Sequence, residues 1–481
     1  MKTMKTMKTI GILRARDIFL LLVLISLALS CGSDDNGMDC PDPTNANCDQ
    51  VGEDPQDDDP QDDDPVVLEP TLSSVAPVTG PKHTEVVITG ENFGTDATKV
   101  SVSFNGTPGE VLEVTDREVT VRVPVGANTG PITMVVDGFD LTGPEFVYEL
   151  TYTVETFAGS GEEGYEEGSG TEAKFYRPND LVMDSGGNIF VVDRGNNAIR
   201  KIAPDGNVTT FAGGVLGSGE GQFRFPRGLA IDSDDNIYVA DSGNHRIVKV
   251  DPSGDWTLIA GGNGIGYVNA QGTAAKFRFP TGILVGEDAG GSALYVSEDN
   301  HAIRRISLDD DQYLVGTYAG PTIANQPGDR DGDLVRAKFR IPQGMGRSGD
   351  GSILVADYLN HSIRAIDQSA GTVERFAGGD IGHLDGNRSE AKFRGPSDIS
   401  MAGDGTVYIV DSENNCIRHI DSRGNVTTIA GVPDPEVKGY KNGTGDEAQF
   451  HWPTGVLYGR EGEIYVADTF NNAIRKIIPL E

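Results

Sequence analysis

Two adjacent positions in the second half of the chain repeatedly carry arginine or aromatic residues. They follow the phenylalanine of a Phe-x-x-Pro segment or a variant of it, which occurs six times. The first position holds Tyr176, Arg224, Arg278, Arg340, Arg394 and His451, and the second holds Arg177, Phe225, Phe279, Ile341, Gly395 and Trp452. The planar guanidinium fork suits a carboxylate or phosphate, and an aromatic face can stack on a sugar. All of these residues except Ile341 and Gly395 are predicted to form a ligand-binding rim.

An alternative is that each rim arginine pairs with an acid of the neighbouring repeat and holds the repeats together. An acidic residue ends one strand in every copy: Asp193, Asp241, Glu298, Asp357, Asp411 and Asp468. We interpret these acids as structural, because a carboxylate at a strand end can accept backbone N–H bonds from the following turn. The same holds for His245, His301 and His361, which share one turn position with Asn197, Asn415 and Asn472.

Asp180 and Asp398 stand where the other four repeats have glycine, two residues after the proline. This position predicts two carboxylates near the mouth of a central channel. They form a candidate site for a cation or a polar ligand. The spacing of the histidines does not indicate a metal site, and no metal or cofactor is predicted.

The repeats must position these residues, and they indicate a ring. A fourteen-residue strand pair recurs every 48 to 59 residues, first at residues 189–202 and last at residues 464–477. Each copy also has a Pro-led strand and a strand ending in Ala-Gly, and four strands per unit is propeller architecture. The first Ala-Gly strand (153–158) precedes all the other strands, so its pairing with the last strand (474–479) would close the ring.

Residues 151–481 resemble the NHL-repeat β-propeller family over their whole length, with six blades. Residues 70–150 contain short alternating strands, the segment Pro77-Val-Thr-Gly80-Pro81 and the turn Gly90-Glu-Asn92-Phe93-Gly94. This region resembles an IPT/TIG domain, an immunoglobulin-like β-sandwich. The expected fold class is therefore all-β, with a sandwich followed by a six-bladed propeller closed by pairing of its N- and C-terminal strands.

The N-terminal residues have the pattern of a targeting signal. Residues 1–30 combine basic residues with a 12-residue apolar run (18–29), which is too short to span a bilayer and is typical of a signal peptide. Leu27-Ala-Leu-Ser-Cys31 resembles a bacterial lipobox, which implies lipidation of Cys31. The acidic residues that follow Cys31 resemble the export signal of Bacteroidota surface lipoproteins. Residues 31–69 are expected to form a disordered acidic tether, in which Cys40 and Cys48 could pair.

The chain of 481 residues has a formal net charge of −34. Such acidity argues against binding to nucleic acid and to an anionic membrane surface, so membrane contact is expected only through the lipid anchor. Fourteen acids and no base lie in residues 31–69, so much of the charge belongs to the tether. The Arg-rich rim is the one place where an anionic partner is still expected.

Three functions fit these features. The first is a non-catalytic, monomeric lipoprotein of the outer membrane that faces the cell exterior and binds a polysaccharide through one propeller face. The second is a protein-interaction scaffold with an envelope protein as partner. The third is a propeller enzyme of the lyase or lactone hydrolase type, although no catalytic residue stands out from the repeats. The rim predicts the first function.

Overall fold

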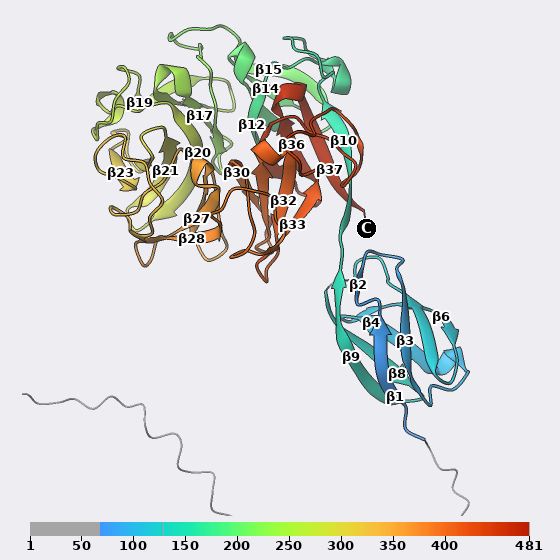
Figure 1. The fold of residues 1–481 in the computed structure, drawn as a ribbon. Helices are drawn as coiled ribbons and strands as arrows, with labels where there is room; N and C mark the ends of the chain where they lie inside the picture. Colours follow the sequence, from blue (N-terminus) through green and yellow to red (C-terminus); the bar gives the residue numbers. More distant parts are fainter. Residues whose placement is uncertain (1–67, 128, 481) are drawn as a thin grey trace, which may run out of the picture. The chain divides into compact units, whose positions relative to one another are not determined.

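The computed structural model describes residues 68–127 and 129–480. The predicted signal peptide, nearly all of the tether, the lipidation site Cys31, and Cys40 and Cys48 lie outside these residues. Within the described part of the chain, no helix is long and apolar enough to cross a membrane. The described residues form two sheet assemblies, one in residues 71–148 and the other in residues 151–480 (Figure 1).

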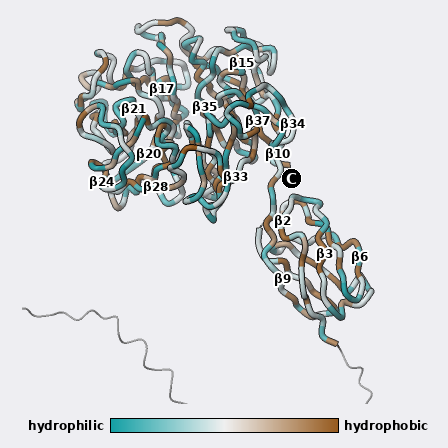
Figure 2. Tube along the Cα trace, viewed as in Figure 1, coloured by the Kyte–Doolittle hydropathy of each residue, from teal (hydrophilic) through white to brown (hydrophobic). Residues whose placement is uncertain are grey.

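Residues 71–148 form two packed sheets. One contains β1 (Thr71–Ala76), β3 (Glu85–Glu91), β7 (Glu118–Arg122) and β6 (Glu110–Val114), in that order. The other contains β2 (Thr79–Gly80), β9 (Phe139–Tyr148), β8 (Gly130–Val136), β4 (Val100–Phe104) and β5 (Thr107–Pro108). Figure 2 shows hydrophobic and hydrophilic residues interspersed along this part of the chain. Buried residues alternate with more exposed ones in strands such as β3 and β4 (VSVSF), and the buried apolar residues of these two strands lie in the core of the sandwich. This is the predicted immunoglobulin-like sandwich.

Residues 151–480 form six antiparallel sheets in sequence, which we call blades 1 to 6. The innermost strands are β12 (Pro178–Met183), β16 (Leu229–Ile231), β20 (Pro280–Asp288), β25 (Pro342–Arg347), β30 (Pro396–Met401) and β35 (Pro453–Tyr458). The second strands are β13 (Ile189–Asp193), β17 (Ile237–Asp241), β21 (Gly291–Glu298), β26 (Ile353–Asp357), β31 (Val407–Asp411) and β36 (Ile464–Asp468). Successive innermost strands contact one another, and β35 contacts β12, so they enclose a central channel.

The outer half of each blade follows the same plan. The third strands are β14 (Ala198–Ile202), β18 (Arg246–Val250), β22 (Ala302–Ser307), β27 (Ser362–Asp367), β32 (Cys416–Ile420) and β37 (Ala473–Leu480). The outermost strands are β15 (Asn207–Gly213), β19 (Trp256–Gly261), β23 (Val315–Ala319), β28 (Thr372–Gly378), β33 (Asn425–Ala430) and β10 (Thr151–Ala158). Two-residue strands from the connectors extend four blades: β11 (Gly168–Ser169), β24 (Gly332–Asp333), β29 (Gly386–Asn387) and β34 (Gly443–Thr444).

The two ends of the propeller close the ring. Strand β10 pairs antiparallel with β37, from Thr151 opposite Leu480 to Ala158 opposite Ile474 (Figure 1). Blade 6 therefore takes its outermost strand from the beginning of the repeat region and its other main strands from the end. This confirms the predicted closure, which removes the free edges that an open sheet would expose.

Candidate functional site

The acid at the end of each second strand fixes the chain where it enters the innermost strand. One carboxylate oxygen accepts the backbone N–H of the first rim position, as Asp193 does from Tyr176 at 2.8 Å and Asp411 from Arg394 at 2.7 Å. The expectation that the following turn supplies backbone N–H groups is wrong. The donor comes from the loop before the innermost strand, and the following turn contributes an asparagine side chain, as Asn414 does to Asp411 at 2.8 Å.

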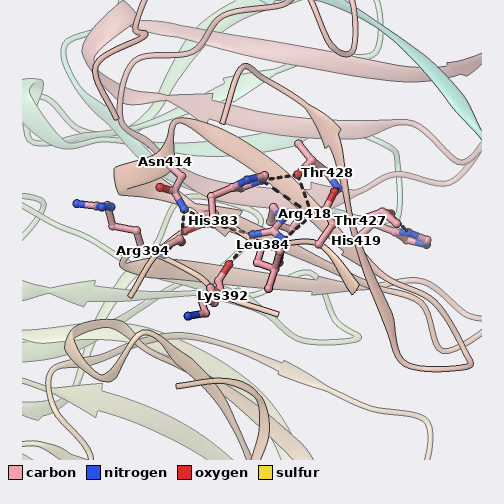
Figure 3. Close-up of polar contacts among 12 residues, drawn as sticks. His383, Leu384, Lys392, Arg394, Asn414, Arg418, His419, Thr427 and Thr428 are labelled. Carbon is pink, nitrogen blue, oxygen red and sulfur yellow. Dashed lines mark hydrogen bonds and ion pairs between the residues drawn. The ribbon is translucent and has the colours of Figure 1, made fainter. Parts of the chain in front are cut away.

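The other oxygen of each acid binds an arginine of the third strand in the same blade. These buried arginines are Arg200, Arg246, Arg304, Arg364, Arg418 and Arg475. In blade 5, Arg418 lies 3.0 Å from Asp411 and also donates to the carbonyls of Lys392 and Leu384, both at 2.9 Å (Figure 3). The interpretation of the acids as structural therefore fits the geometry.

Blade 3 builds the same contact with a longer acid. The turn after Glu298 is one residue shorter than in the other blades and forms no 3-10 helix. The extra methylene of Glu298 spans the difference, because the side chain still accepts from Arg278 N at 2.8 Å and pairs with Arg304 at 3.0 Å. The substitution of Glu for Asp thus compensates for the missing turn residue.

Shortening this side chain should destabilise the propeller. The Glu298→Asp variant cannot reach both partners, so either the Arg278 amide or the Arg304 guanidinium loses its acceptor, at a cost of about 1–3 kcal/mol. Urea unfolding followed by tryptophan fluorescence measures the loss, because both tryptophans, Trp256 and Trp452, lie in the propeller. An unchanged unfolding midpoint in Glu298→Asp would contradict the compensation.

The second rim position links neighbouring blades. Its residues are Arg177, Phe225, Phe279, Ile341, Gly395 and Trp452, all of which have left-handed backbone with φ between 45° and 60°. Each backbone amide donates to the asparagine or histidine of the preceding blade's turn, as Phe225 does to Asn197 Oδ1 at 2.8 Å and Ile341 to His301 Nδ1 at 3.1 Å. His245 and His361 accept through Nδ1 in the same way. Asparagine and histidine can replace each other at this position, because both side chains place a hydrogen-bond acceptor two bonds beyond Cβ.

These contacts define one surface of the propeller. The turn after each second strand donates a backbone amide to the carbonyl of the first rim position, as Gly195 does to Tyr176 at 2.7 Å. Turns, rim positions and the residues after each proline therefore lie on one face. We call it the mouth face: residues 176–180, 224–228, 278–282, 340–344, 394–398 and 451–455, with turns 194–197, 242–245, 299–301, 358–361, 412–415 and 469–472.

The four predicted rim arginines are clamped through their backbones and free at their side chains. In the part of the chain that the structure describes, the guanidinium groups of Arg224, Arg278, Arg340 and Arg394 form no hydrogen bond or ion pair. The alternative that they pair with the neighbouring blade's acid is wrong, because the third-strand arginines already occupy those acids. Free guanidinium groups on one face can bind an anionic ligand.

The channel itself is narrow at this face. Its mouth holds a cavity of about 30 Å³, lined mainly by the residues one or two positions after each proline, such as Asn179, Arg227 and Thr454. Small-molecule sites in proteins enclose about 300–1,000 Å³, so this mouth admits little more than water. The ten predicted rim residues do not line the cavity. They lie before the prolines, over the second strands, and form a wider circle than the sequence suggested.

Asp180 and Asp398 lie in the channel and separate its two parts. Both line the mouth cavity and also a second cavity of about 210 Å³, whose walls are mostly apolar. Each carboxylate accepts a backbone amide from the next blade, Asp180 from Leu229 at 2.8 Å and Asp398 from Val456 at 2.9 Å. Burial raises the pKa of Asp180 to about 6, and burial with the Asp180 charge raises the pKa of Asp398.

The pair of aspartates is therefore built into the contacts between blades. Their position agrees with the predicted placement near the mouth in blades 1 and 5. Among the described residues, no group of three or more His, Cys, Asp or Glu side chains is arranged to hold a metal ion.

The structure adds three residues that the sequence reasoning missed. Arg194 follows the acid of blade 1, Arg227 follows the proline of blade 2, and Phe470 lies in the turn of blade 6. Their signal was present, since aligning the six repeats one residue beyond the proline and one beyond the acid exposes both arginines. Phe470 stands two residues after Asp468, where the other blades have glycine, asparagine, leucine or glutamate.

One domain family and one repeat family match parts of the chain. The IPT/TIG domain matches residues 70–154, and the NHL repeat matches residues 175–202, 223–250 and 393–420. Protein SUPPRESSOR OF QUENCHING 1 of Arabidopsis thaliana is 29% identical over 280 residues, which cover 54% of this chain and 26% of that protein. NHL repeat-containing protein 2 of Homo sapiens is 29% identical over 160 residues, 30% of this chain and 22% of that protein. The chain thus spans about a quarter of the length of these relatives.

Solved structures resemble the chain over most of its length. A Bacteroides thetaiotaomicron protein of unknown function is 25% identical, with a TM-score of 0.54, and the match covers 87% of this chain and 99% of that one. Auxiliary nutrient binding proteins of Bacteroides thetaiotaomicron and Bacteroides ovatus are each 20% identical with TM-scores of 0.53, covering 85% and 86% of this chain and 97% and 99% of theirs. The protein is therefore an IPT/TIG domain followed by a propeller of NHL repeats.

Proposed function

We propose that this protein is a non-catalytic binding protein of the bacterial cell envelope that takes an extracellular polysaccharide on the mouth face. The observation that carries the proposal is the set of free guanidinium groups at Arg224, Arg278, Arg340 and Arg394, on a protein whose net charge is −34. Arginine without an internal partner can bind carboxylates and sugar hydroxyls as a donor without first breaking an ion pair.

Exposed aromatic side chains on the same face support a glycan as the ligand. Phe225, Phe470 and Trp452 are 48%, 41% and 37% exposed. An aromatic ring that remains in water loses its hydration when a sugar stacks on it, which favours binding. The narrow mouth of the channel directs an extended ligand across the face rather than into the channel.

Two further considerations favour this function and location. The solved structures with the same fold include proteins described as auxiliary nutrient binding proteins, which supports a binding role in the envelope. The lipobox-like segment before Cys31 supports anchoring by a lipid at the outer membrane, with the tether as spacer. An envelope protein as an alternative partner would be recognised by the same face.

Removing two rim arginines should weaken polysaccharide binding. Titration calorimetry of the purified chain against acidic and neutral polysaccharides tests the proposal with the Arg278→Ala/Arg340→Ala variant. Each lost charge-assisted contact is worth about 1.5–3 kcal/mol, so we expect a loss of roughly tenfold or more in affinity per arginine.

Arg347→Ala/Arg460→Ala is the matched control. Both arginines are exposed and lie at or just beyond the far ends of innermost strands, away from the mouth face, so this variant removes the same charge elsewhere. Equal affinity of the rim variant and the unmodified chain would overturn the mouth-face assignment. Binding of envelope proteins but of no polysaccharide would favour the scaffold function instead.

A further inference from the structure

One sector of the mouth face, formed by blades 6, 1 and 2, combines aromatic rings with arginine. The guanidinium of Arg177 lies over the rings of Tyr176 and Phe470, with 5.4 Å to each centroid. The ring of Phe470 packs near Trp452, with 6.0 Å between centroids. A cation held over one side of an aromatic platform leaves the rest of the platform free for a ligand.

Three arginines of this sector repel one another. Burial is the main cause that lowers the pKa of Arg194 to about 10, and the nearby charges of Arg227 and Arg177 act in the same direction. The Nε atom of Arg194 is buried and has no hydrogen-bond partner. No ion pair within 4 Å neutralises any of the three in the described part of the chain. This sector therefore holds excess positive charge that an anion would relieve.

Two carboxylates also lie on the mouth face. Asp299 interacts with Arg227 and with Arg278, so it lies between this sector and the opposite one. Glu413 lies beside His361 in blades 4 and 5 and accepts a hydrogen bond from Tyr358 at 2.7 Å. Asp299 therefore offsets part of the charge of Arg227 and Arg278. Arg227 also lines the mouth cavity together with Asp180. Within the described residues, Arg177 and Arg194 have no carboxylate ion pair within 4 Å, and these two charges lie beside the Phe470 and Trp452 platform.

We propose that this sector is the subsite for an acidic sugar. The pyranose ring stacks on Phe470 and Trp452, and its carboxylate binds Arg177 and Arg194. The planar carboxylate matches the guanidinium fork in a bidentate arrangement. This inference rests on the proposed function and specifies its ligand class, namely a polysaccharide that contains uronic acids.

Charge-matched probes test the subsite directly. The purified chain is titrated with polygalacturonate and with alginate, each beside its carboxyl-reduced form, which keeps the sugar backbone and loses the negative charge. We expect the acidic forms to bind at least tenfold more tightly than the reduced forms at about 0.1 M salt. Raising the salt concentration should shrink this difference, because the ions screen the contact.

Two double variants locate the preference. Arg177→Gln/Arg194→Gln should lose the preference for the acidic form, whereas Arg340→Gln/Arg394→Gln, in the opposite sector, should keep it. Trp452→Ala should weaken both forms equally, because Trp452 contacts the sugar ring, whereas Phe470 also supports the guanidinium of Arg177. Circular dichroism and the urea unfolding midpoint of each variant establish that the fold is intact.

The outcomes separate this inference from the proposed function. If the chain binds polysaccharides but does not prefer the acidic forms, the acidic-sugar subsite is wrong and the binding function stands. The same conclusion follows if Arg340→Gln/Arg394→Gln loses the preference and Arg177→Gln/Arg194→Gln keeps it. If neither acidic nor reduced polysaccharides bind, the proposed function fails and the subsite fails with it.

Discussion

Replacing Asp411 by alanine is expected to lower the free energy of unfolding of the propeller by about 3–5 kcal/mol. Asp411 and Arg418 are both fully buried, and their charged groups lie 3.0 Å apart. Burial raises the pKa of Asp411 to about 6, so the carboxylate is ionised at neutral pH. Its removal takes the buried acid from Arg418, which keeps only the half-exposed Asp385 at 2.6 Å among the described carboxylates, and the Arg394 amide and Asn414 side chain lose their acceptor. Urea unfolding followed by tryptophan fluorescence measures the loss.

An exposed acid in a neighbouring blade provides the control. Glu374 lies on the outermost strand β28, and its side chain is exposed. Glu374→Ala should change the stability by no more than about 0.5 kcal/mol. A loss below about 1 kcal/mol in Asp411→Ala would show that the acid does not hold the blade together.

Replacing the three turn histidines by alanine is also expected to lower the free energy of unfolding strongly. The His245→Ala/His301→Ala/His361→Ala variant removes the acceptors of three backbone amides that join neighbouring blades. Each unsatisfied amide costs about 1–3 kcal/mol, so the propeller should lose several kcal/mol. The matched variant with asparagine at all three positions should stay near the unmodified stability at pH 7.5. Asn197, Asn415 and Asn472 already perform this role in the other blades.

The same positions predict a dependence of stability on pH. Burial lowers the pKa of His245, His301 and His361. The unfolded chain then takes up protons at a higher pH than the folded chain, so stability is full above the unfolded value of about 6.5 and falls as the pH drops through it. Asp299 and Glu413 oppose these shifts, whereas Arg278, Arg340 and Arg394 reinforce them at His301 and His361.

Unfolding midpoints between pH 7.5 and pH 5.5 test this dependence. The triple asparagine variant should lose less stability over this range than the unmodified chain, because an amide oxygen does not titrate. The remaining slope comes from other groups, including His383, His419 and His451, whose pKa values are also lowered by burial. Equal slopes in the two proteins would show that the histidines do not accept through Nδ1 in solution.

In two blades, a change at one position of the acid–arginine contact is compensated by a change at another position. Blade 2 has valine where the other blades have the third-strand arginine, and Arg246 two residues earlier makes the contact with its acid at 2.7 Å. Blade 3 pairs a shorter turn with the longer Glu298. Both compensations are written in the sequence, but they are understood only when the contact that they preserve is known.

The order and pattern of residues along the chain were enough to predict the all-β architecture, the repeat of four strands and the closure of the ring. The alternation of apolar residues and the order of the repeats can be seen in the sequence itself. A closed propeller is the arrangement in which each four-stranded repeat buries its faces against two neighbours. The sequence also placed the rim residues on one face, because they occupy equivalent positions in every repeat.

The contacts that those residues make depend on the packing of the blades. Arg278 and Arg418 are both repeated arginines, yet Arg418 is buried against an acid and Arg278 keeps a free guanidinium group. The difference depends on where each residue lies in the blade, since Arg418 is on the third strand next to the acid and Arg278 is in the loop before the innermost strand. Likewise, Arg177 and Arg194 come from different positions of blade 1, and Arg227 lies near Arg194 only because blades 1 and 2 pack side by side. The interaction energy between two charges depends on the distance between them in space, and the number of residues between them along the chain does not give this distance.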